Sequence, residues 1–336
     1  MPIVHSSFRP AWWLRGGHLQ TLWAPLVRFS PTVKRQRERL ELEDGDFLDL
    51  DWQLEGEGPL IVVLHGLTGS SESKYVLGLQ RDLKQINWRS VAINFRGCSG
   101  EPNRLPRSYH SGETGDLDFV VRLVQERFPN TPLGAVGFSL GGNVLLKWLG
   151  EKSRTCLFGA VAASVPLQLG RCSRHLEQGF AKVYMNRFVR DLRASLQFKH
   201  SHLTESGWSN HADTLKPFLS AADVKTLWDF DDVVTAPLHG FRDAEHYYDT
   251  CSSRQFVKDI ALPTTIIHAV DDPFMPDDIF PTESELSDCV TLELTPFGGH
   301  VGFLTGLTPG RPRYWLEHRI VECLVSHYRE HGFSLS

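Results

Sequence analysis

The apolar residues of this chain of 336 residues form two patterns that alternate along its central part. Short runs that are continuously apolar and β-branched are typical of strands buried on both faces of a parallel sheet. Segments with apolar residues three or four positions apart are typical of helices. Strands are predicted at residues 60–64, 90–95, 133–136 and 158–165, and helices at residues 74–85, 115–128 and 143–149. This order predicts right-handed βαβ units and a parallel sheet.

The pattern is different at the two ends of the chain. Residues 1–35, rich in Trp and Pro, are predicted to form an irregular N-terminal arm that packs on the core. Residues 39–52 alternate apolar and acidic positions around an Asp-Gly-Asp turn, which indicates two half-buried strands in a hairpin. Toward the C-terminus, residues 264–270 are predicted to form a strand, residues 290–294 the last strand and residues 313–329 a helix.

Residues 166–235 interrupt the alternation of strands and helices. This stretch has helical character and several aromatic residues, and exposed loops of such length are uncommon in compact domains. We therefore interpret residues 166–235 as a helical cap inserted over the carboxyl edge of the sheet. The remainder of residues 1–336 is expected to form a single domain.

Composition and charge narrow the classes of function. The formal net charge is -5 at pH 7, so the chain lacks the basic surface of nucleic-acid binders and no nucleic-acid partner is expected. Six cysteines occur without a C-x-x-C motif, which argues against a disulfide framework and a zinc knuckle and favours a reducing compartment. Residues 1–23 lack the apolar core of a signal peptide, and no later stretch is long enough to span a membrane. A cytoplasmic protein without stable membrane insertion is expected, and its oligomeric state is left open.

The pentapeptide Gly-Phe-Ser-Leu-Gly at residues 137–141 lies between a predicted strand and a predicted helix. In that setting G-x-S-x-G is typical of the nucleophile elbow, where glycines allow a sharp turn that exposes the serine oxygen. The pentapeptide also occurs by chance in loops whose serine caps a helix, so its meaning depends on the rest of the chain. A hydroxyl is a weak nucleophile at neutral pH, so Ser139 needs a neighbouring base and an acid that orients the base.

Candidates for the base and the acid follow the two later strands. Asp272 comes after the strand at residues 264–270, and His300 comes after the strand at residues 290–294. The chain order Ser, Asp, His belongs to α/β-hydrolases and differs from the orders in trypsin and subtilisin. We therefore predict Ser139, Asp272 and His300 as a catalytic triad at the carboxyl edge of the sheet. The adjacent Asp271 is the alternative acid, although the Asp-x-Phe-x-Pro spacing favours Asp272.

The predicted triad also requires donors for the oxyanion of a tetrahedral intermediate. The backbone N–H of Leu140, directly after the nucleophile, is the first candidate. The backbone N–H of Leu67, in the His-Gly-Leu loop after the strand at residues 60–64, is the second. These two amides are predicted to form the oxyanion hole.

Other polar residues have weaker claims. Turn, helix-cap or pocket-lining roles are all open for Arg96, Cys98, Ser99, His110, Ser111, Gly112 and Glu113. The sequence contains no H-E-x-x-H motif that would indicate a zinc site. Two pairs of residues in the cap are expected to lie on its solvated surface and not to bind a metal: His200 with His202, and Asp231 with Asp232. No G-x-G-x-x-G or P-loop motif occurs. No metal and no cofactor are expected.

Several motifs together resemble the YheT-type hydrolases of bacteria, part of an α/β-hydrolase subfamily that includes yeast ethyl-ester-forming acyltransferases and mammalian lipid-acting members. They are Gly-Phe-Ser-Leu-Gly-Gly-Asn from residue 137, Phe-Arg-Gly-Cys-Ser-Gly-Glu-Pro-Asn from 95, Tyr-His-Ser-Gly-Glu from 109, Asp-Asp-Pro-Phe-Met from 271 and Gly-Gly-His-Val-Gly-Phe from 298. The resemblance also covers Gly-His-Leu-Gln-Thr from residue 17 and the stretch from Phe230 to Tyr248. It implies the α/β-hydrolase fold and a carboxylic-ester hydrolase for short to medium acyl chains.

The residues and the resemblance together predict a serine esterase with a small-molecule ester as substrate. Ser139 would attack the ester carbonyl and form an acyl-enzyme that water releases. One alternative is an acyltransferase that passes the acyl group to an alcohol with the same residues. Another is a binding protein that has the fold without catalysis.

Overall fold

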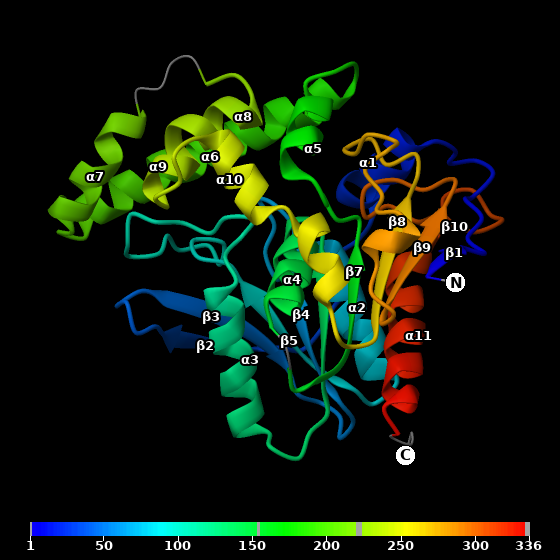
Figure 1. Ribbon diagram of the computed structural model, residues 1–336. Helices are drawn as coiled ribbons and strands as arrows, with labels where there is room; N and C mark the ends of the chain where they lie inside the picture. Colours follow the sequence, from blue (N-terminus) through cyan, green and yellow to red (C-terminus); the bar gives the residue numbers. More distant parts are fainter. Residues whose placement is uncertain (1, 153–154, 220–223, 333–336) are drawn as a thin grey trace.

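The computed structural model describes residues 2–152, 155–219 and 224–332, and its centre is a nine-stranded sheet (Figure 1). The strand order is β1-β9-β8-β7-β6-β4-β5-β3-β2. The strands are β1 (Ile3–His5), β2 (Gln36–Glu41), β3 (Phe47–Gln53), β4 (Leu60–Leu64), β5 (Arg89–Asn94), β6 (Leu133–Phe138), β7 (Leu157–Ala163), β8 (Thr264–Ala269) and β9 (Val290–Thr295). In this sheet β3 pairs in antiparallel fashion with both β2 and β5, and the other neighbouring strands pair in parallel, so the prediction of a mostly parallel sheet is confirmed.

The continuous apolar runs arise because both faces of the sheet are buried. In β4, Leu60, Val62 and Leu64 face one apolar cluster. Ile61 and Val63 face another cluster on the opposite side. Burying a side chain of this size contributes roughly 1.5–3 kcal/mol to folding, so such a strand is stable only where helices cover both faces.

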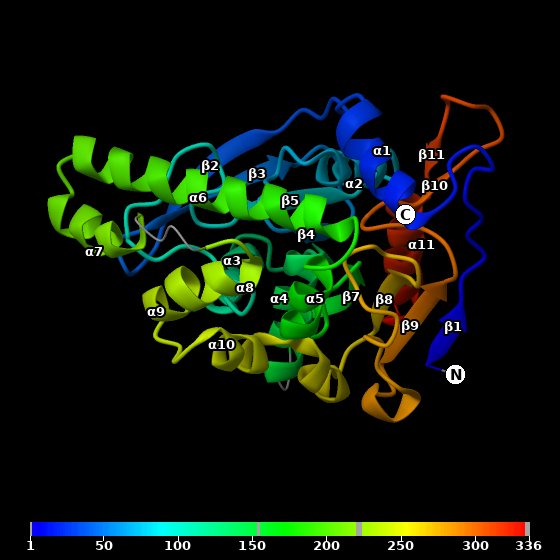
Figure 2. The ribbon, with the colours of Figure 1, turned by 90° about the horizontal axis from the view of Figure 1, so that it is seen from above.

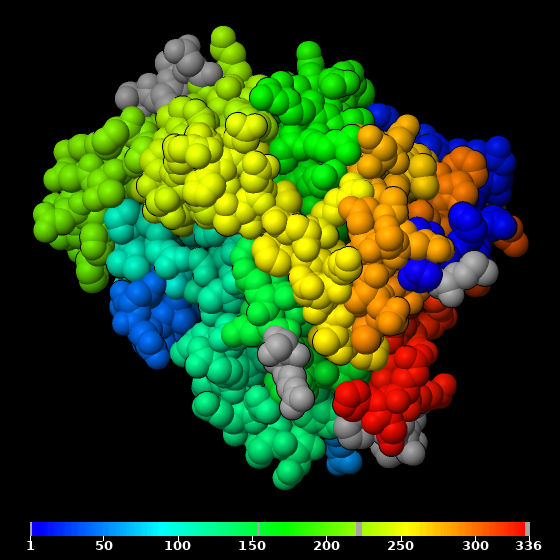
Figure 3. All heavy atoms as spheres, in the orientation of Figure 1, coloured from blue at the N-terminus to red at the C-terminus, as the bar shows by residue number. Residues whose placement is uncertain are grey.

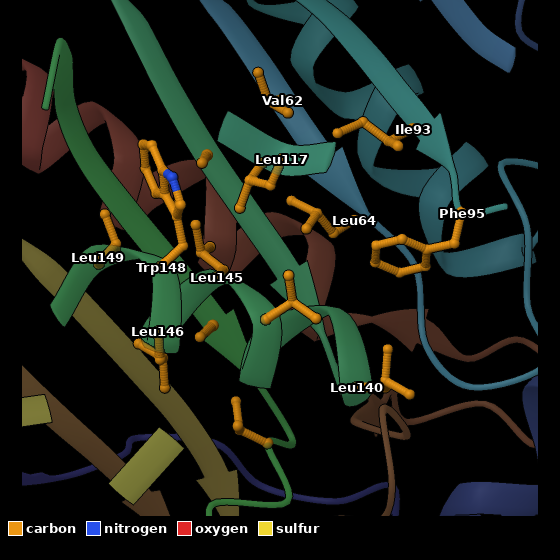
Figure 4. Close-up of a cluster of buried hydrophobic side chains, with 14 of the residues drawn as sticks. Val62, Leu64, Ile93, Phe95, Leu117, Leu140, Leu145, Leu146, Trp148 and Leu149 are labelled. Carbon is orange, nitrogen blue, oxygen red and sulfur yellow. The ribbon is translucent and has the colours of Figure 1, made fainter. Parts of the chain in front are cut away.

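Four helices cover the two faces of the sheet, and two of them were predicted at the same residues to within one position. Helices α2 (Lys74–Gln85) and α11 (Trp315–Glu330) pack on one face, and α3 (Gly115–Arg127) and α4 (Leu140–Glu151) pack on the other. Figure 4 shows Leu145 of α4 and Leu117 of α3 on the side of the sheet where Val62 and Leu64 of β4 lie.

A layer of helices lies between β7 and β8 in the sequence and above the carboxyl edge of the sheet (Figures 1 and 2). It contains α5 (Leu169–Leu176), α6 (Ala181–Glu205), α7 (Ser209–Leu219), α8 (Leu227–Phe230), the π-helix η1 (Asp231–Thr235), α9 (Ala236–Leu238) and α10 (Ala244–Cys251). The 3-10 helix η2 (Ser253–Asp259) follows α10 and packs along α4, where Phe256 lies against Gly150. In Figure 3 the yellow-green atoms of this layer lie directly against the teal atoms of the layer below. The helical segments therefore continue past residue 235, where the sequence pattern placed the end of the cap.

The prediction of an irregular N-terminal arm is wrong for two segments. Residues 3–5 form β1, which pairs in parallel with β9 at the edge of the sheet, in the register Ile3 to Leu292. Helix α1 (Gly17–Val27) follows, with Pro25 inside it. Apolar spacing did not indicate α1, because the helix buries only one turn: Gly17, Gln20 and Thr21.

Two smaller differences concern strands. Strand β3 is buried along its whole length, whereas the sequence indicated a half-buried strand, because β3 lies between β2 and β5 and its acidic side chains are covered by arginines of β2. Strand β9 is also followed by a short hairpin of β10 (Leu304–Thr305) and β11 (Arg313–Tyr314), so it is not the last strand. A further 3-10 helix, η3 (Glu283–Glu285), precedes β9. The two-residue strands β10 and β11 are too short to leave a periodic signal in the sequence.

Candidate active site

Ser139 sits at a sharp turn between β6 and α4, at the carboxyl edge of the sheet. Its backbone has φ 51° and ψ -119°, a conformation that is strained for a residue with a side chain. The two glycines of the pentapeptide permit this turn, since a Cβ at Gly141 would lie 2.5 Å from the carbonyl oxygen of His65. A Cβ at Gly137 would collide with the backbone of Gly141. The turn presents the Ser139 hydroxyl to the space above the sheet.

The three predicted triad residues meet at this edge. Ser139 Oγ lies 2.8 Å from His300 Nε2, and His300 Nδ1 lies 2.9 Å from Asp272 Oδ2. The Asp272 side chain is fully buried, and the His300 side chain is 10% exposed. The ring of Phe274 stacks on the imidazole of His300 with centroids 4.0 Å apart. Parallel strands β6, β8 and β9 bring these residues together because their carboxyl ends lie at one edge.

Asp272, and not its neighbour Asp271, is the carboxylate that contacts His300. The other oxygen of Asp272 accepts the N–H of Phe274 at 2.9 Å, which fixes the carboxylate in its loop. Asp271 points toward the backbone of Gly298 and Gly17, and its burial raises the pKa of the carboxyl to about 6. Adjacent residues of a turn point in different directions, so only one of the two can face the histidine.

The loop after β4 places the amide of Leu67 beside Ser139. The preceding N–H, of Gly66, donates to the hydroxyl of Tyr75 at 2.9 Å. The following N–H, of Thr68, donates to the hydroxyl of Tyr109 at 2.9 Å. Within the described residues, the N–H groups of Leu67 and Leu140 donate to no protein acceptor, and both residues line the same cavity as Ser139. Two amide donors are thus available next to the serine.

The loop that carries His300 is held by residues that the sequence reasoning missed. The N–H of His300 donates to Thr21 Oγ1 of helix α1 at 2.8 Å. The next N–H, of Val301, donates to Ser164 Oγ at 3.0 Å. The Gly-His-Leu-Gln-Thr motif at residues 17–21 contributed to the family resemblance, but the motif alone does not identify the partner of Thr21.

A cavity of about 170 Å³ opens above Ser139 and His300 and extends under the upper helical layer. Its walls are mainly apolar side chains from α5, α6 and the segment of α8 to α9. These side chains include Leu169, Leu176, Phe188, Leu192, Leu196, Leu227, Phe230, Val234 and Leu238. The arrangement can bury an apolar group next to the serine hydroxyl.

Asp231 also lines this cavity, which corrects the prediction of a solvated surface position. Its carboxylate accepts hydrogen bonds from Thr235 Oγ1 and from the hydroxyl of Tyr248, both at 2.6 Å. Burial raises the pKa of Asp231 to about 6. Its neighbour Asp232 is exposed, as predicted. The π-helix η1 widens the turn at this point, and periodicity could not indicate which of the two faces inward.

Lys199 of α6 is a second buried charge that the sequence reasoning missed. Its Nζ donates to Asn103 Oδ1 at 2.8 Å and to the carbonyl oxygens of Pro106 and Arg107 at 3.0 and 2.6 Å. Burial lowers the pKa of Lys199 to about 7. The contacts attach the upper layer to the loop that follows β5.

The weaker candidates are divided between the cavity wall and structural contacts. Arg96, His110 and Ser111 line the cavity, and Arg96 also forms a bidentate ion pair with Asp116. Burial raises the pKa of the Cys98 thiol to about 12. The others do not line the cavity and make local contacts: Ser99 with Asp49, Gly112 with His110, and Glu113 with Arg107. His200 and His202 do not line the cavity.

The described residues offer neither a metal site nor a membrane-spanning helix. Among them, no group of three or more His, Cys, Asp and Glu side chains is arranged to hold a metal ion. No helix within the described ranges combines the length and the apolar character needed to cross a membrane.

Comparisons with known proteins agree with this geometry. A family described as the alpha/beta hydrolase fold matches residues 59–307. The chain is 40% identical over 328 residues to "Putative esterase YheT" of Escherichia coli (strain K12), covering 96% of this chain and 94% of that protein. It is 31% identical over 352 residues to "Phospholipase ABHD3" of Mus musculus, covering 100% of this chain and 82% of that protein.

A solved structure shows the same fold at low sequence identity. The Pyrococcus furiosus esterase Pf2001 aligns with a TM-score of 0.56 and 17% identity, covering 89% of this chain and 98% of that chain. The resemblance to YheT-type hydrolases and the predicted fold class are confirmed. The chain belongs to the α/β-hydrolase family, in the subfamily that includes YheT and ABHD3.

Proposed function

We propose that this protein is a serine esterase that hydrolyses carboxylic esters of short to medium acyl chains through an acyl-enzyme on Ser139. The observation that carries the proposal is the continuous chain of hydrogen-bond distances from Ser139 through His300 to Asp272. A serine hydroxyl in reach of an imidazole, itself oriented by a buried carboxylate, is the arrangement that acyl transfer requires.

The first half of the reaction forms the acyl-enzyme. His300 Nε2 accepts the proton of Ser139 as its Oγ attacks the carbonyl carbon of the ester. Asp272 holds the imidazole in the required tautomer and stabilises the imidazolium that forms. His300 then gives the proton to the leaving alcohol, and the acyl group remains on Ser139.

The oxyanion of the tetrahedral intermediate would be bound by the N–H groups of Leu67 and Leu140. Donors of this kind are typically worth about 3 kcal/mol each in the transition state. The tyrosine contacts on both sides of Leu67 support this role, because they fix the orientation of the loop without using the Leu67 amide itself. In the second half, His300 would activate water, which releases the acid and restores Ser139.

The cavity and the relatives support an ester with an apolar acyl group. The walls above Ser139 are mainly apolar, which favours a hydrocarbon chain over a peptide or a sugar. The relatives are called an esterase and a phospholipase, and both names describe cleavage of ester bonds. A small-molecule ester is therefore the proposed substrate class.

The test is hydrolysis of p-nitrophenyl butyrate by the wild type and by Ser139→Ala. Loss of the nucleophile is expected to lower kcat by about 10⁴-fold or more. Ser195→Ala, which changes another serine of the cavity wall, is the matched control and is expected to retain activity. Labelling by a fluorophosphonate probe should likewise require Ser139. Equal rates for the wild type and Ser139→Ala would contradict the proposal.

A further inference from the structure

The carboxylate of Asp231 is a charged group in the wall of the cavity that the proposed mechanism does not use. Hydrogen bonds from Thr235 and Tyr248 fix its position, one to each oxygen. A carboxylate accepts about four hydrogen bonds, so each oxygen retains capacity for another donor. Among the described residues, Asp231 has no cationic partner.

Three basic side chains of the cavity wall are engaged elsewhere. Arg96 is paired with Asp116 on one side and with Asp44 on the other. Lys199 donates to Asn103 and to backbone carbonyls. His239 has its two ring nitrogens at 2.7 and 2.9 Å from backbone carbonyl oxygens. None of these groups neutralises Asp231.

Asp231 is half-buried, and a carboxylate that is partly removed from water without a cationic partner is costly, so proteins keep one mainly where it serves a function. Asp231 also begins the π-helix η1, and single π-helical turns occur frequently at functional sites. The carboxylate is thus fixed, negatively charged at neutral pH and open toward the space that would hold the substrate. The aromatic rings of Tyr247 and Tyr248 line the same space and would favour a cation further.

We propose that Asp231 is a specificity-determining residue that binds a positively charged, hydrogen-bond-donating nitrogen of the substrate or product. This inference rests on the proposed function, since it assigns a substrate class to the same cavity. The ligand class is an ester whose acyl or alcohol part carries an ammonium group at the end of an apolar chain. Asp231 does not take part in bond cleavage.

The test measures binding and does not depend on hydrolysis. n-Hexylammonium and n-hexanol differ chiefly in charge and present the same apolar chain. Their affinities for the Ser139→Ala protein are measured by isothermal titration calorimetry at pH 7.5. We expect the ammonium to bind about tenfold to a hundredfold more tightly, as a charge-assisted hydrogen bond to a carboxylate predicts. Equal affinities of the two ligands would overturn the inference, and this comparison needs no substitution of Asp231.

Two neighbouring variants then identify the residue. Asp231→Asn keeps the shape of the side chain and removes its charge, so it should abolish the preference for hexylammonium and leave hexanol binding unchanged. Asp232→Asn makes the same change of net charge at the adjacent exposed position and should retain the preference. Equal loss in both variants would show a general effect of charge and would overturn the inference.

The outcomes separate the two proposals. If p-nitrophenyl butyrate is not hydrolysed but hexylammonium binds through Asp231, the proposed reaction fails and the cation site stands. If the ester is hydrolysed and Asp231→Asn binds both ligands as before, the reaction stands and the cation site fails. Circular dichroism tests whether Asp231→Asn folds. If it does not fold, the comparison of hexylammonium with hexanol on the Ser139→Ala protein alone tests the cation site.

Discussion

The backbone N–H of His300 donates a hydrogen bond of 2.8 Å to Thr21 Oγ1, although the two residues are 279 positions apart. The Thr21 hydroxyl in turn donates to the carbonyl oxygen of Gly17 at 2.7 Å. Helix α1 thereby fixes the backbone of a loop that also holds Val301 at φ 54°, a strained conformation for a β-branched residue. The position of the proposed base depends on this contact from the N-terminal segment.

Thr21→Val should therefore impair catalysis through its effect on His300, although Thr21 itself does not contact the substrate. The variant keeps the shape of the side chain but leaves the His300 N–H without an acceptor, which costs about 1–3 kcal/mol in a buried position. We expect kcat for p-nitrophenyl butyrate to fall about tenfold to a hundredfold with little change in KM, because a displaced base slows the chemical step. Thr21→Ser keeps the oxygen and should restore most of kcat. A Thr21→Val protein with wild-type kcat would refute this role.

The two adjacent aspartates should differ sharply in their effect on the rate. Asp272→Asn removes the group that orients His300 and should lower kcat by about 10⁴-fold. Asp271→Asn has no contact with the imidazole and should lower kcat less than about tenfold. Steady-state hydrolysis of p-nitrophenyl butyrate by the two variants, at equal folded concentration, measures the difference. A larger loss for Asp271→Asn would reassign the acid of the proposed triad.

The close approach of helix α4 to the loop after β4 predicts a severe effect of Gly141→Ala. The added Cβ would lie 2.5 Å from the carbonyl oxygen of His65 and 2.7 Å from that of Leu64. The clash can be relieved only if backbone in the core moves, so we expect the free energy of unfolding to fall by about 2–4 kcal/mol or more. Gly170→Ala, in helix α5, is the control. Its added Cβ would lie no closer than 3.4 Å to the side chains of Trp228 and Tyr248, which is an ordinary contact distance. Thermal melts of both variants provide the comparison, and equal melting temperatures would contradict the packing argument.

The buried carboxyl of Asp231 predicts a stability that depends on pH. Its pKa is raised to about 6 in the folded protein, so the folded state retains a proton that the unfolded state has lost between about pH 4 and 6. The contribution of this group to stability therefore falls as pH rises through that window. Asp231→Asn should raise the free energy of unfolding, and by about 1 kcal/mol more at pH 8 than at pH 5. Urea titrations at both pH values test this, and Asp232→Asn should show no such difference.

The parts of the fold that could be predicted are those that a local pattern specifies. The continuous apolar run of β4 reflects burial on two faces, and the helical spacing of α3 reflects burial on one. The Ser139 turn was recognisable because glycine is required on both sides of it. Chain order and strand ends then sufficed to place Asp272 and His300 near Ser139 before any distance was known.

The parts that could not be predicted depend on contacts between distant segments. Thr21 and Ser164 support the His300 loop through hydrogen bonds that leave no periodic signal. Lys199 lies between Leu196 and Leu203 on the buried side of α6, and apolar spacing does not indicate that a lysine is buried there, since its burial depends on its partners in the loop after β5. Asp231 faces inward because a π-helix changes the rotation per residue, which a regular helical pattern does not anticipate.

The pairing of β1 with β9 has a consequence for synthesis of the chain. Ile3 pairs in register with Leu292, so the first strand has no partner until almost the whole protein has been made. Contacts between such distant segments form late in folding. A nascent chain that stops before residue 290 contains the nucleophile but neither β9, the partner of β1, nor His300. Under the proposed chemistry, a ribosome-bound fragment would be inert toward esters, and activity would arise only when β9 has docked and His300 has reached Ser139.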